Sequence, residues 1–281
     1  MSNQLEPRRT KLTIAQWSVL AGAFLLAAVL YFGFDTRPPS FDRVEAERAG
    51  SLKSTDLNGL LRVAKADVGT TDMGEIVALE SRLHDVTEGD TVSQLASLEA
   101  LSGKWYSLGK YGVAAGYAEQ IAELRQTATA WNIAGANYVY CLQNEQEDKV
   151  KSYCTDRAVS AFETAAAMEP GNADHRINLA LVYVENPPED NPMRGIRMLL
   201  SLNEREPDNV NVLGQLGRLA IQTKQFDRAV QRLEKAVSLQ PQNLRVNCLL
   251  AEAYRGTGQT AQAEQFQSRC SALRKDLQNL N

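Results

Sequence analysis

A spaced pattern of small and apolar residues recurs along this chain and restricts the folds open to it more than any other feature. In residues 210–243, Gly217 and Ala229 lie on two successive segments rich in helix-forming residues, and Pro241 follows the second. Small residues at facing positions let two helix backbones approach, and a proline ends the second helix before another begins. Matching residues occur at the same offsets in four other segments, 95–127, 128–172, 173–209 and 244–281. The sequence therefore predicts about five consecutive helical hairpins.

The clearest of these hairpins resembles the tetratricopeptide repeat (TPR). The positions that this family keeps apolar, small or proline are filled here by Leu213, Leu216, Gly217, Ala220, Ala229, Leu233, Ala236 and Pro241. The resemblance covers residues 95–281. It implies a solenoid of stacked hairpins whose first helices line a surface that binds other proteins.

The composition agrees with an all-α fold. Alanine, leucine, glutamine and glutamate dominate the repeat segments, and all four favour helices. The 9 prolines among 281 residues leave long stretches free for helices. The formal net charge of −4 gives no sign of the basic stripe that nucleic-acid binding requires. We therefore expect an all-α protein without a nucleic-acid partner.

Several segments depart from the repeat pattern, among them an insertion at Glu185–Pro192 within 173–209. Residues 44–94 contain amphipathic stretches, Glu45–Ala66 and Asp72–Asp85, from which we expect a degenerate hairpin that caps the array. Within 128–172, an insertion from about Leu142 to Asp156 is expected to be a charged, solvated loop.

A long apolar run near the N-terminus has the length of a membrane span. Residues 12–34 would rise about 34 Å as a helix, which is enough to cross a hydrocarbon core of about 30 Å. A cleaved signal peptide has a shorter apolar region and ends in a small-x-small site. This run ends instead in Tyr31-Phe32-Gly33-Phe34. We therefore favour an uncleaved transmembrane anchor over a cleaved signal.

The charges around this run favour a cytoplasmic N-terminus. Basic residues next to a membrane span tend to stay in the cytoplasm, and the tail 1–11 carries Arg8, Arg9 and Lys11. The far flank mixes both signs, with only Arg37 immediately beside the membrane. We expect 1–11 to be a cytoplasmic tail and 35–43 a stiff linker, so that the repeats lie on the opposite side of the membrane.

The repeat register suggests two pairs among the four cysteines. Cys141 is expected at the end of one helix and Cys154 just before the next, so that a disulfide would tie the base of the insertion. Cys248 and Cys270 fall on the two antiparallel helices of the last hairpin, where they could face each other. Two disulfides require an oxidising compartment such as a bacterial periplasm, in agreement with the charge-based orientation. The alternative is four free thiols in a reducing compartment.

Polar residues of the first helices are the candidates for binding. In the register above, those expected to point towards the inner face of the solenoid are Asn132, Asn178, Gln215, Arg218, Arg245, Glu252 and Arg255. They could grip an extended peptide or a partner helix. Alternatively, they are only the exposed side of these helices.

No catalytic signature occurs in the sequence, which lacks a Gly-rich phosphate loop and the GxSxG and HExxH motifs. The 2 histidines, His84 and His175, are far from the cysteines in sequence, and no CxxC pair occurs, so a metal site is not expected. We expect His175 and the carboxylates of Glu145, Glu147 and Asp148 to be solvated. The chain is expected to need no cofactor, to bind no small-molecule substrate and to be no enzyme.

The whole layout also resembles a known arrangement. A short cytoplasmic tail, one membrane helix and an external TPR domain are shared with bacterial inner-membrane proteins that assist the Sec translocon or cytochrome c maturation. The resemblance implies a periplasmic scaffold or adaptor that binds protein partners or emerging client polypeptides. The alternative is a transport receptor of the mitochondrial outer-membrane kind with cytosolic repeats, against which the basic tail and the paired cysteines argue. An enzyme with an unrecognised site is the third class.

Overall fold

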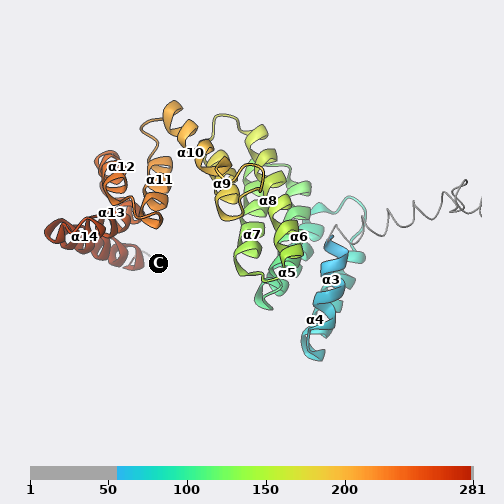
Figure 1. Cartoon of the computed structure of the whole chain (residues 1–281). Coiled ribbons are helices and arrows are strands. Elements are labelled where there is room, and N and C mark those ends of the chain that lie inside the picture. The colour runs from blue at the N-terminus through green and yellow to red at the C-terminus, as the bar shows by residue number, and fades with distance from the viewer. Residues whose placement is uncertain (1–55, 280–281) are drawn as a thin grey trace, which may run out of the picture. The chain divides into compact units, whose positions relative to one another are not determined.

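The computed structural model describes residues 56–279, which form helices joined by short connections (Figure 1). The all-α class is confirmed for this part of the chain. Its helices are α3 (Leu57–Ala66), α4 (Thr70–His84), α5 (Thr91–Ser107), α6 (Tyr111–Arg125), α7 (Ala128–Asn144), α8 (Asp148–Met168), α9 (Ala173–Glu185), α10 (Arg194–Arg205), α11 (Val210–Gln222), α12 (Phe226–Leu239), α13 (Leu244–Gly256) and α14 (Thr260–Asn279).

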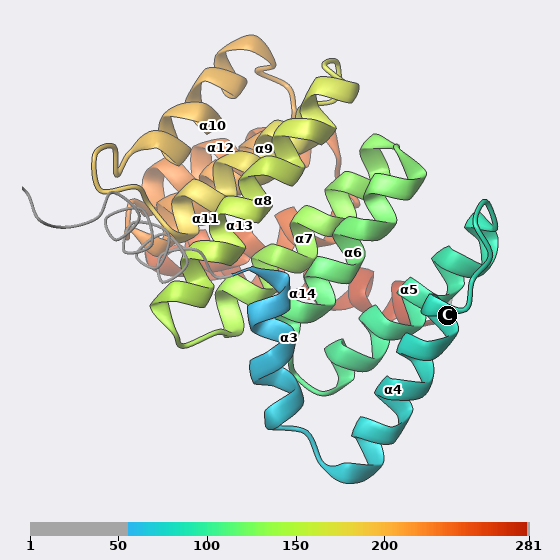
Figure 2. The same cartoon turned by 90° about the vertical axis from the view of Figure 1, so that its right-hand side faces the viewer.

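The helices from α5 onward pack in consecutive pairs. Each helix makes its main contacts with the helices just before and after it in sequence, and the two views in Figures 1 and 2 show α6, α7 and α8 side by side. The buried side chains accordingly form several clusters, each drawn from a few successive helices. This nearest-neighbour packing is the structural definition of a solenoid.

Asparagines fix where three of the first helices begin. Asn172, Asn209 and Asn243 each precede a helix, and each side-chain oxygen accepts a hydrogen bond from a backbone amide of the first turn. Such caps satisfy amides that have no partner within the helix. Each asparagine follows a proline by two residues, at Pro170, Pro207 and Pro241, so the same short motif ends one helix and starts the next.

The close approach that the repeat pattern predicts occurs at Gly217. A Cβ atom on this residue would lie 2.6 Å from two carbons of Leu233, which is fully buried on α12. Ala229, the other small residue of this hairpin, is also fully buried. Helices α11 and α12 therefore pack at a spacing that only a glycine at position 217 permits.

The insertion in the 128–172 repeat is not a loop, and this prediction is wrong. Helix α7 continues to Asn144 and α8 begins at Asp148, which leaves only residues 145–147 as a connection. Cys154 lies within α8 rather than before it. The inserted residues extend both helices because apolar positions at Cys141, Val150 and Cys154 continue the buried stripe between them.

Both cysteine pairs expected from the register form disulfides in the structure. Cys141 of α7 is bonded to Cys154 of α8, with their Cα atoms 6.2 Å apart. Cys248 of α13 is bonded to Cys270 of α14, with a Cα separation of 5.0 Å. Each bond therefore links the two helices of one hairpin.

Helices α3 and α4 do not pair with each other as a capping hairpin. Helix α3 packs on α6, and α4 packs on α5. Helix α3 can pack on α6 because Gly116 of α6 has no side chain. A Cβ atom at this position would lie only 2.4 Å from Leu57 of α3. An ion pair between Lys65 and Glu80 connects α3 to α4 at 2.6 Å.

The expected anchor at residues 12–34 lies outside the described residues, as do the tail 1–11, the linker 35–43 and the start of the 44–94 segment. Within residues 56–279, no helix combines the length and the apolar character that crossing a membrane requires.

Two glycines of α11 provide a matched test of the packing. We expect Gly217→Ala to destabilise the fold by about 1–3 kcal/mol, because the new methyl group overlaps Leu233 in a closed core. Gly214→Ala should instead be neutral or stabilising by up to about 1 kcal/mol, since its Cβ would meet only Val246 at 3.7 Å and alanine favours helices. Urea-unfolding midpoints followed by circular dichroism measure both effects. Shifts of the same sign and size would contradict this packing.

Candidate binding surface on the first helices

The predicted inner-face residues come from α7, α9, α11 and α13, and the structure separates them into groups. Asn132 and Asn178 meet between α7 and α9, where the Nδ2 of Asn178 donates to the Oδ1 of Asn132 at 2.9 Å. Gln215 and Arg218 meet on α11. Arg255 of α13 donates instead to the Oε1 of Gln267 on α14 at 3.2 Å. Glu252 is exposed and makes no ion pair with any residue in 56–279.

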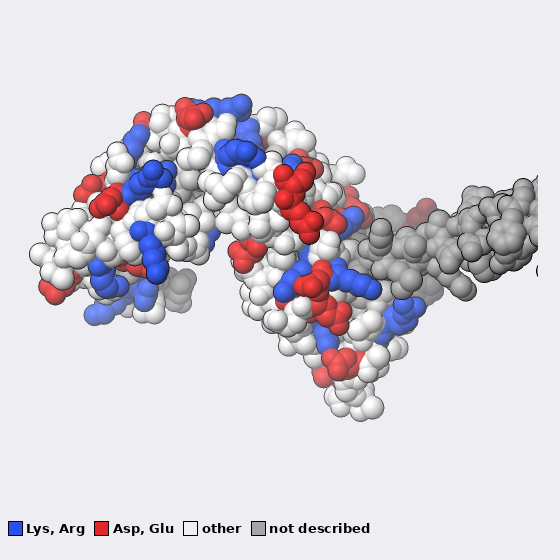
Figure 3. Space-filling view, viewed as in Figure 1, with Lys and Arg blue, Asp and Glu red and all other residues white. Residues whose placement is uncertain are grey.

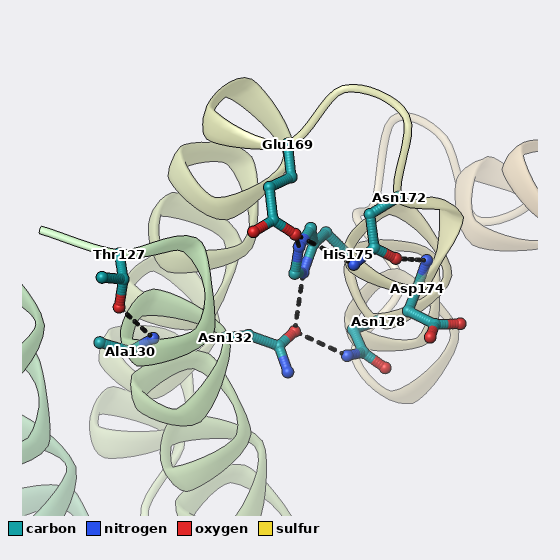
Figure 4. Close-up of polar contacts among 8 residues, drawn as sticks. All are labelled: Thr127, Ala130, Asn132, Glu169, Asn172, Asp174, His175 and Asn178. Carbon is teal, nitrogen blue, oxygen red and sulfur yellow. Dashed lines mark hydrogen bonds and ion pairs between the residues drawn. The ribbon is translucent and has the colours of Figure 1, made fainter.

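His175 joins the asparagine pair, and the expectation that it is solvated is wrong. Its ring is only 4% exposed and lies between α7 and α9 (Figure 4). One ring nitrogen, Nδ1, is 3.2 Å from the Oδ1 of Asn132, and Nε2 is 3.2 Å from the Oε2 of Glu169. Because both ring nitrogens have oxygen partners, the ring can be buried at little cost. Its position three residues before Asn178, on the same side of the helix, was the available sequence signal.

The asparagine group is therefore mainly a link between neighbouring repeats. The Oδ1 of Asn132 is shared by His175 and Asn178, and Asn211 of α11 makes a similar link to Asp174 of α9 at 2.8 Å. These bonds occupy side chains that a ligand would otherwise use. The more accessible binding groups lie further along the array.

Arg218 is the most unusual charged residue on this surface. It is half-buried, and its Nε donates to the Oε1 of Gln215 at 3.1 Å, while Gln215 itself is only 6% exposed. Its guanidinium forms no ion pair with any residue in 56–279. Burial lowers the pKa of Arg218, and the positive charge of Arg245 lowers it further, whereas Glu185 acts in the opposite direction.

Arg245 supplies a second positive charge beside Arg218. It is exposed on α13 and makes neither a hydrogen bond nor an ion pair with another described side chain. Two arginines from successive first helices are thus held near each other, and neither forms an ion pair with a described carboxylate, although the charge of Glu185 acts on Arg218. Guanidinium groups bind carboxylates through two parallel hydrogen bonds, so this arrangement suits a carboxylate from another molecule.

On the face seen in Figure 3, basic and acidic side chains are interspersed over the helices. That face therefore carries no broad patch of a single sign. Among residues 56–279, no cluster of His, Cys, Asp and Glu side chains is arranged to hold a metal ion.

Comparison with known families identifies the repeat. Residues 220–273 match the family model of the tetratricopeptide repeat, which confirms the TPR prediction from the end of α11 into α14. Repeats of this type serve protein–protein interaction and generally form non-catalytic scaffolds. No curated protein matches the chain.

Several solved structures are similar to this chain at low sequence identity. A crystal structure of MamA protein is 14% identical, with 66% of this chain and 93% of that chain covered and a TM-score of 0.40. MamA from Desulfovibrio magneticus RS-1, from residue 41 to its end, is also 14% identical, with 68% and 98% covered and a TM-score of 0.41. YrrB, described as a TPR protein with an unusual peptide-binding site, is 16% identical, with 71% and 93% covered and a TM-score of 0.37.

The contact between Glu169 and His175 predicts a dependence of stability on pH. Hydrogen bonds from His175 and Asn172 lower the pKa of Glu169 below its usual 4.5. The ionised carboxylate therefore stabilises the fold above pH 4.5, and this contribution is lost as the pH falls through the lowered pKa. We expect Glu169→Gln to lower the urea midpoint at neutral pH, and the difference from the parent protein to disappear as the pH falls through the lowered pKa of Glu169.

Glu163→Gln is the matched control, because Glu163 is exposed on α8, the helix that Glu169 follows, and has no hydrogen-bond or ion-pair partner among residues 56–279. It should leave the midpoint unchanged at neutral pH and in acid. A difference between Glu169→Gln and the parent that persists unchanged in acid would rule out the assigned contribution.

Proposed function

We propose that this chain is a membrane-tethered TPR scaffold that faces the bacterial periplasm and holds a polypeptide against the first helices of its C-terminal repeats. The partner is a protein or an emerging client of an envelope complex, of the translocon or cytochrome c maturation type. Binding is non-catalytic in this proposal and uses neither a cofactor nor a small-molecule substrate. The anchor is the apolar run at residues 12–34.

The observation that carries the binding proposal is the pairing of Arg218 with Arg245. Burying part of an arginine beside a like charge costs free energy, and the charge of Glu185, which forms no ion pair with Arg218, offsets only part of that cost. A carboxylate of a bound polypeptide would offset it through charge-assisted hydrogen bonds. Gln215 holds the Nε of Arg218, which leaves the two terminal nitrogens of the guanidinium for such a ligand.

The location is supported by two independent features. The basic residues Arg8, Arg9 and Lys11 before the apolar run favour a cytoplasmic N-terminus, which would place the repeats on the trans side. The two disulfides are typical of an oxidising compartment. A cytosolic array, as in an import receptor, would agree neither with the basic residues before the apolar run nor with the two disulfides.

Thiol labelling of intact cells tests the compartment. If the repeats face the periplasm, none of the four cysteines should react with a maleimide until the protein is denatured and reduced. Denaturation without reductant is the control for burial, and it should also give no labelling. Four thiols that react after denaturation alone would exclude the oxidised state and remove this support for the periplasm.

Capture of partners from native membranes tests the site. We expect the Arg218→Gln/Arg245→Gln variant to recover its crosslinked partners about tenfold less efficiently, because it loses charge-assisted hydrogen bonds to the ligand. The matched control is Arg62→Gln/Arg82→Gln, which removes the same two charges from exposed positions on α3 and α4. Equal recovery by the two variants would contradict the assignment of the arginine pair.

A further inference from the structure

A second possible binding site lies where α3, the α5–α6 turn and the α7–α8 connection meet. The structure has a cavity of about 360 Å³ there, within the size range of small-ligand pockets. None of the inner-face residues lines it. The site is thus separate from the proposed arginine pair and does not depend on it.

One part of the cavity wall is apolar. Leu60 and Val63 of α3 contribute to it, together with Val113 of α6 and Val150 of α8. Val63 is 67% exposed although it is a large apolar residue. This wall offers a surface against which an aliphatic side-chain stem can pack.

An aromatic ring forms another part of the wall. Tyr111, the first residue of α6, lines the cavity, and its ring packs edge-on against Tyr140 at 4.7 Å and Tyr106 at 5.3 Å. The two neighbouring rings hold Tyr111 in place. The face of a tyrosine ring attracts a cation that lies within about 6 Å of its centre.

The charge of the rim is negative. Asp67 and Lys110 pair with each other and so neutralise one another. Glu145 and Glu147 also line the cavity, and neither forms an ion pair with a residue in 56–279. The Oε1 of Glu145 accepts hydrogen bonds from the backbone amides of Gln146 and Glu147 at 2.8 and 3.3 Å, which orients this carboxylate.

The inserted turns of α7 and α8 build this rim. Helices α7 and α8 have 17 and 21 residues, compared with 13 and 14 for α11 and α12, and the added turns carry Glu145 and Glu147 to the cavity. The Cys141–Cys154 disulfide joins the two extended helices near this rim. The insertion thus forms a cavity rim that an ordinary repeat lacks.

We infer that this cavity binds a basic side chain, lysine or arginine, presented by a partner polypeptide. The stem would pack on the apolar wall and the charged head would lie between Tyr111 and the carboxylates of Glu145 and Glu147. An apolar wall, an aromatic face and two uncompensated negative charges are complementary to the three parts of such a side chain.

Fluorine NMR of the full chain in lipid nanodiscs tests the inference. The nine tyrosines are replaced biosynthetically by 3-fluorotyrosine, and the Tyr111→Phe variant identifies the Tyr111 signal by its absence. Titration with Nα-acetyl-arginine amide should shift this signal saturably, and added salt should weaken the effect. Nα-acetyl-citrulline amide, which is neutral and nearly the same shape, should leave it in place.

A charge-matched pair of variants completes the test. Glu145→Gln/Glu147→Gln keeps the oxygen that accepts the two amides and should weaken binding about fivefold, whereas Glu88→Gln/Glu123→Gln should not change it. An unchanged Tyr111 signal without ligand verifies that each variant retains the local fold. No shift with the arginine probe, an equal shift with citrulline, or equal affinities of the two double variants would overturn the inference.

Discussion

The close approach of paired helices at small residues is the constraint on which the rest of this structure depends. Gly217 meets Leu233 between α11 and α12, and Gly135, at the same repeat position, meets Phe162 between α7 and α8. Both large partners are fully buried. These contacts set the spacing within each hairpin, and thereby decide which side chains of successive first helices can reach one another. The arginine pair and the asparagine–histidine link are consequences of that spacing.

The features predicted correctly from the sequence are those encoded by local, periodic signals. A proline followed two residues later by an asparagine marks each boundary at Asn172, Asn209 and Asn243, so helix ends could be read directly. The family match to residues 220–273 covers the segment in which the pattern is most regular. The Cys248–Cys270 pair followed from the same register, because antiparallel helices bring fixed offsets together, whereas Cys141–Cys154 was predicted to tie a loop and in fact joins two helices.

The errors arose where tertiary packing overrides a local pattern. The stretch between Leu142 and Asp156 is charged and polar enough to resemble a loop, yet it extends two helices whose buried sides include the Cys141–Cys154 disulfide. His175 can be buried because each of its ring nitrogens has an oxygen partner outside α9, the Oδ1 of Asn132 and the Oε2 of Glu169. An ion pair that no sequence prediction covered, between Glu119, which is 6% exposed, and Arg157, likewise joins residues far apart in sequence. No single-sequence pattern contains these distant partners.

The central claim is that polypeptides bind to the first helices of the C-terminal repeats. Site-specific photocrosslinking in native membranes tests it most directly, with a photoreactive residue placed at Glu252 on α13 or at Gln231 on α12, both of which are exposed. The proposed binding mode predicts protein adducts from position 252 and none from position 231. Adducts from position 231 alone, or equal adducts from both positions, would contradict it.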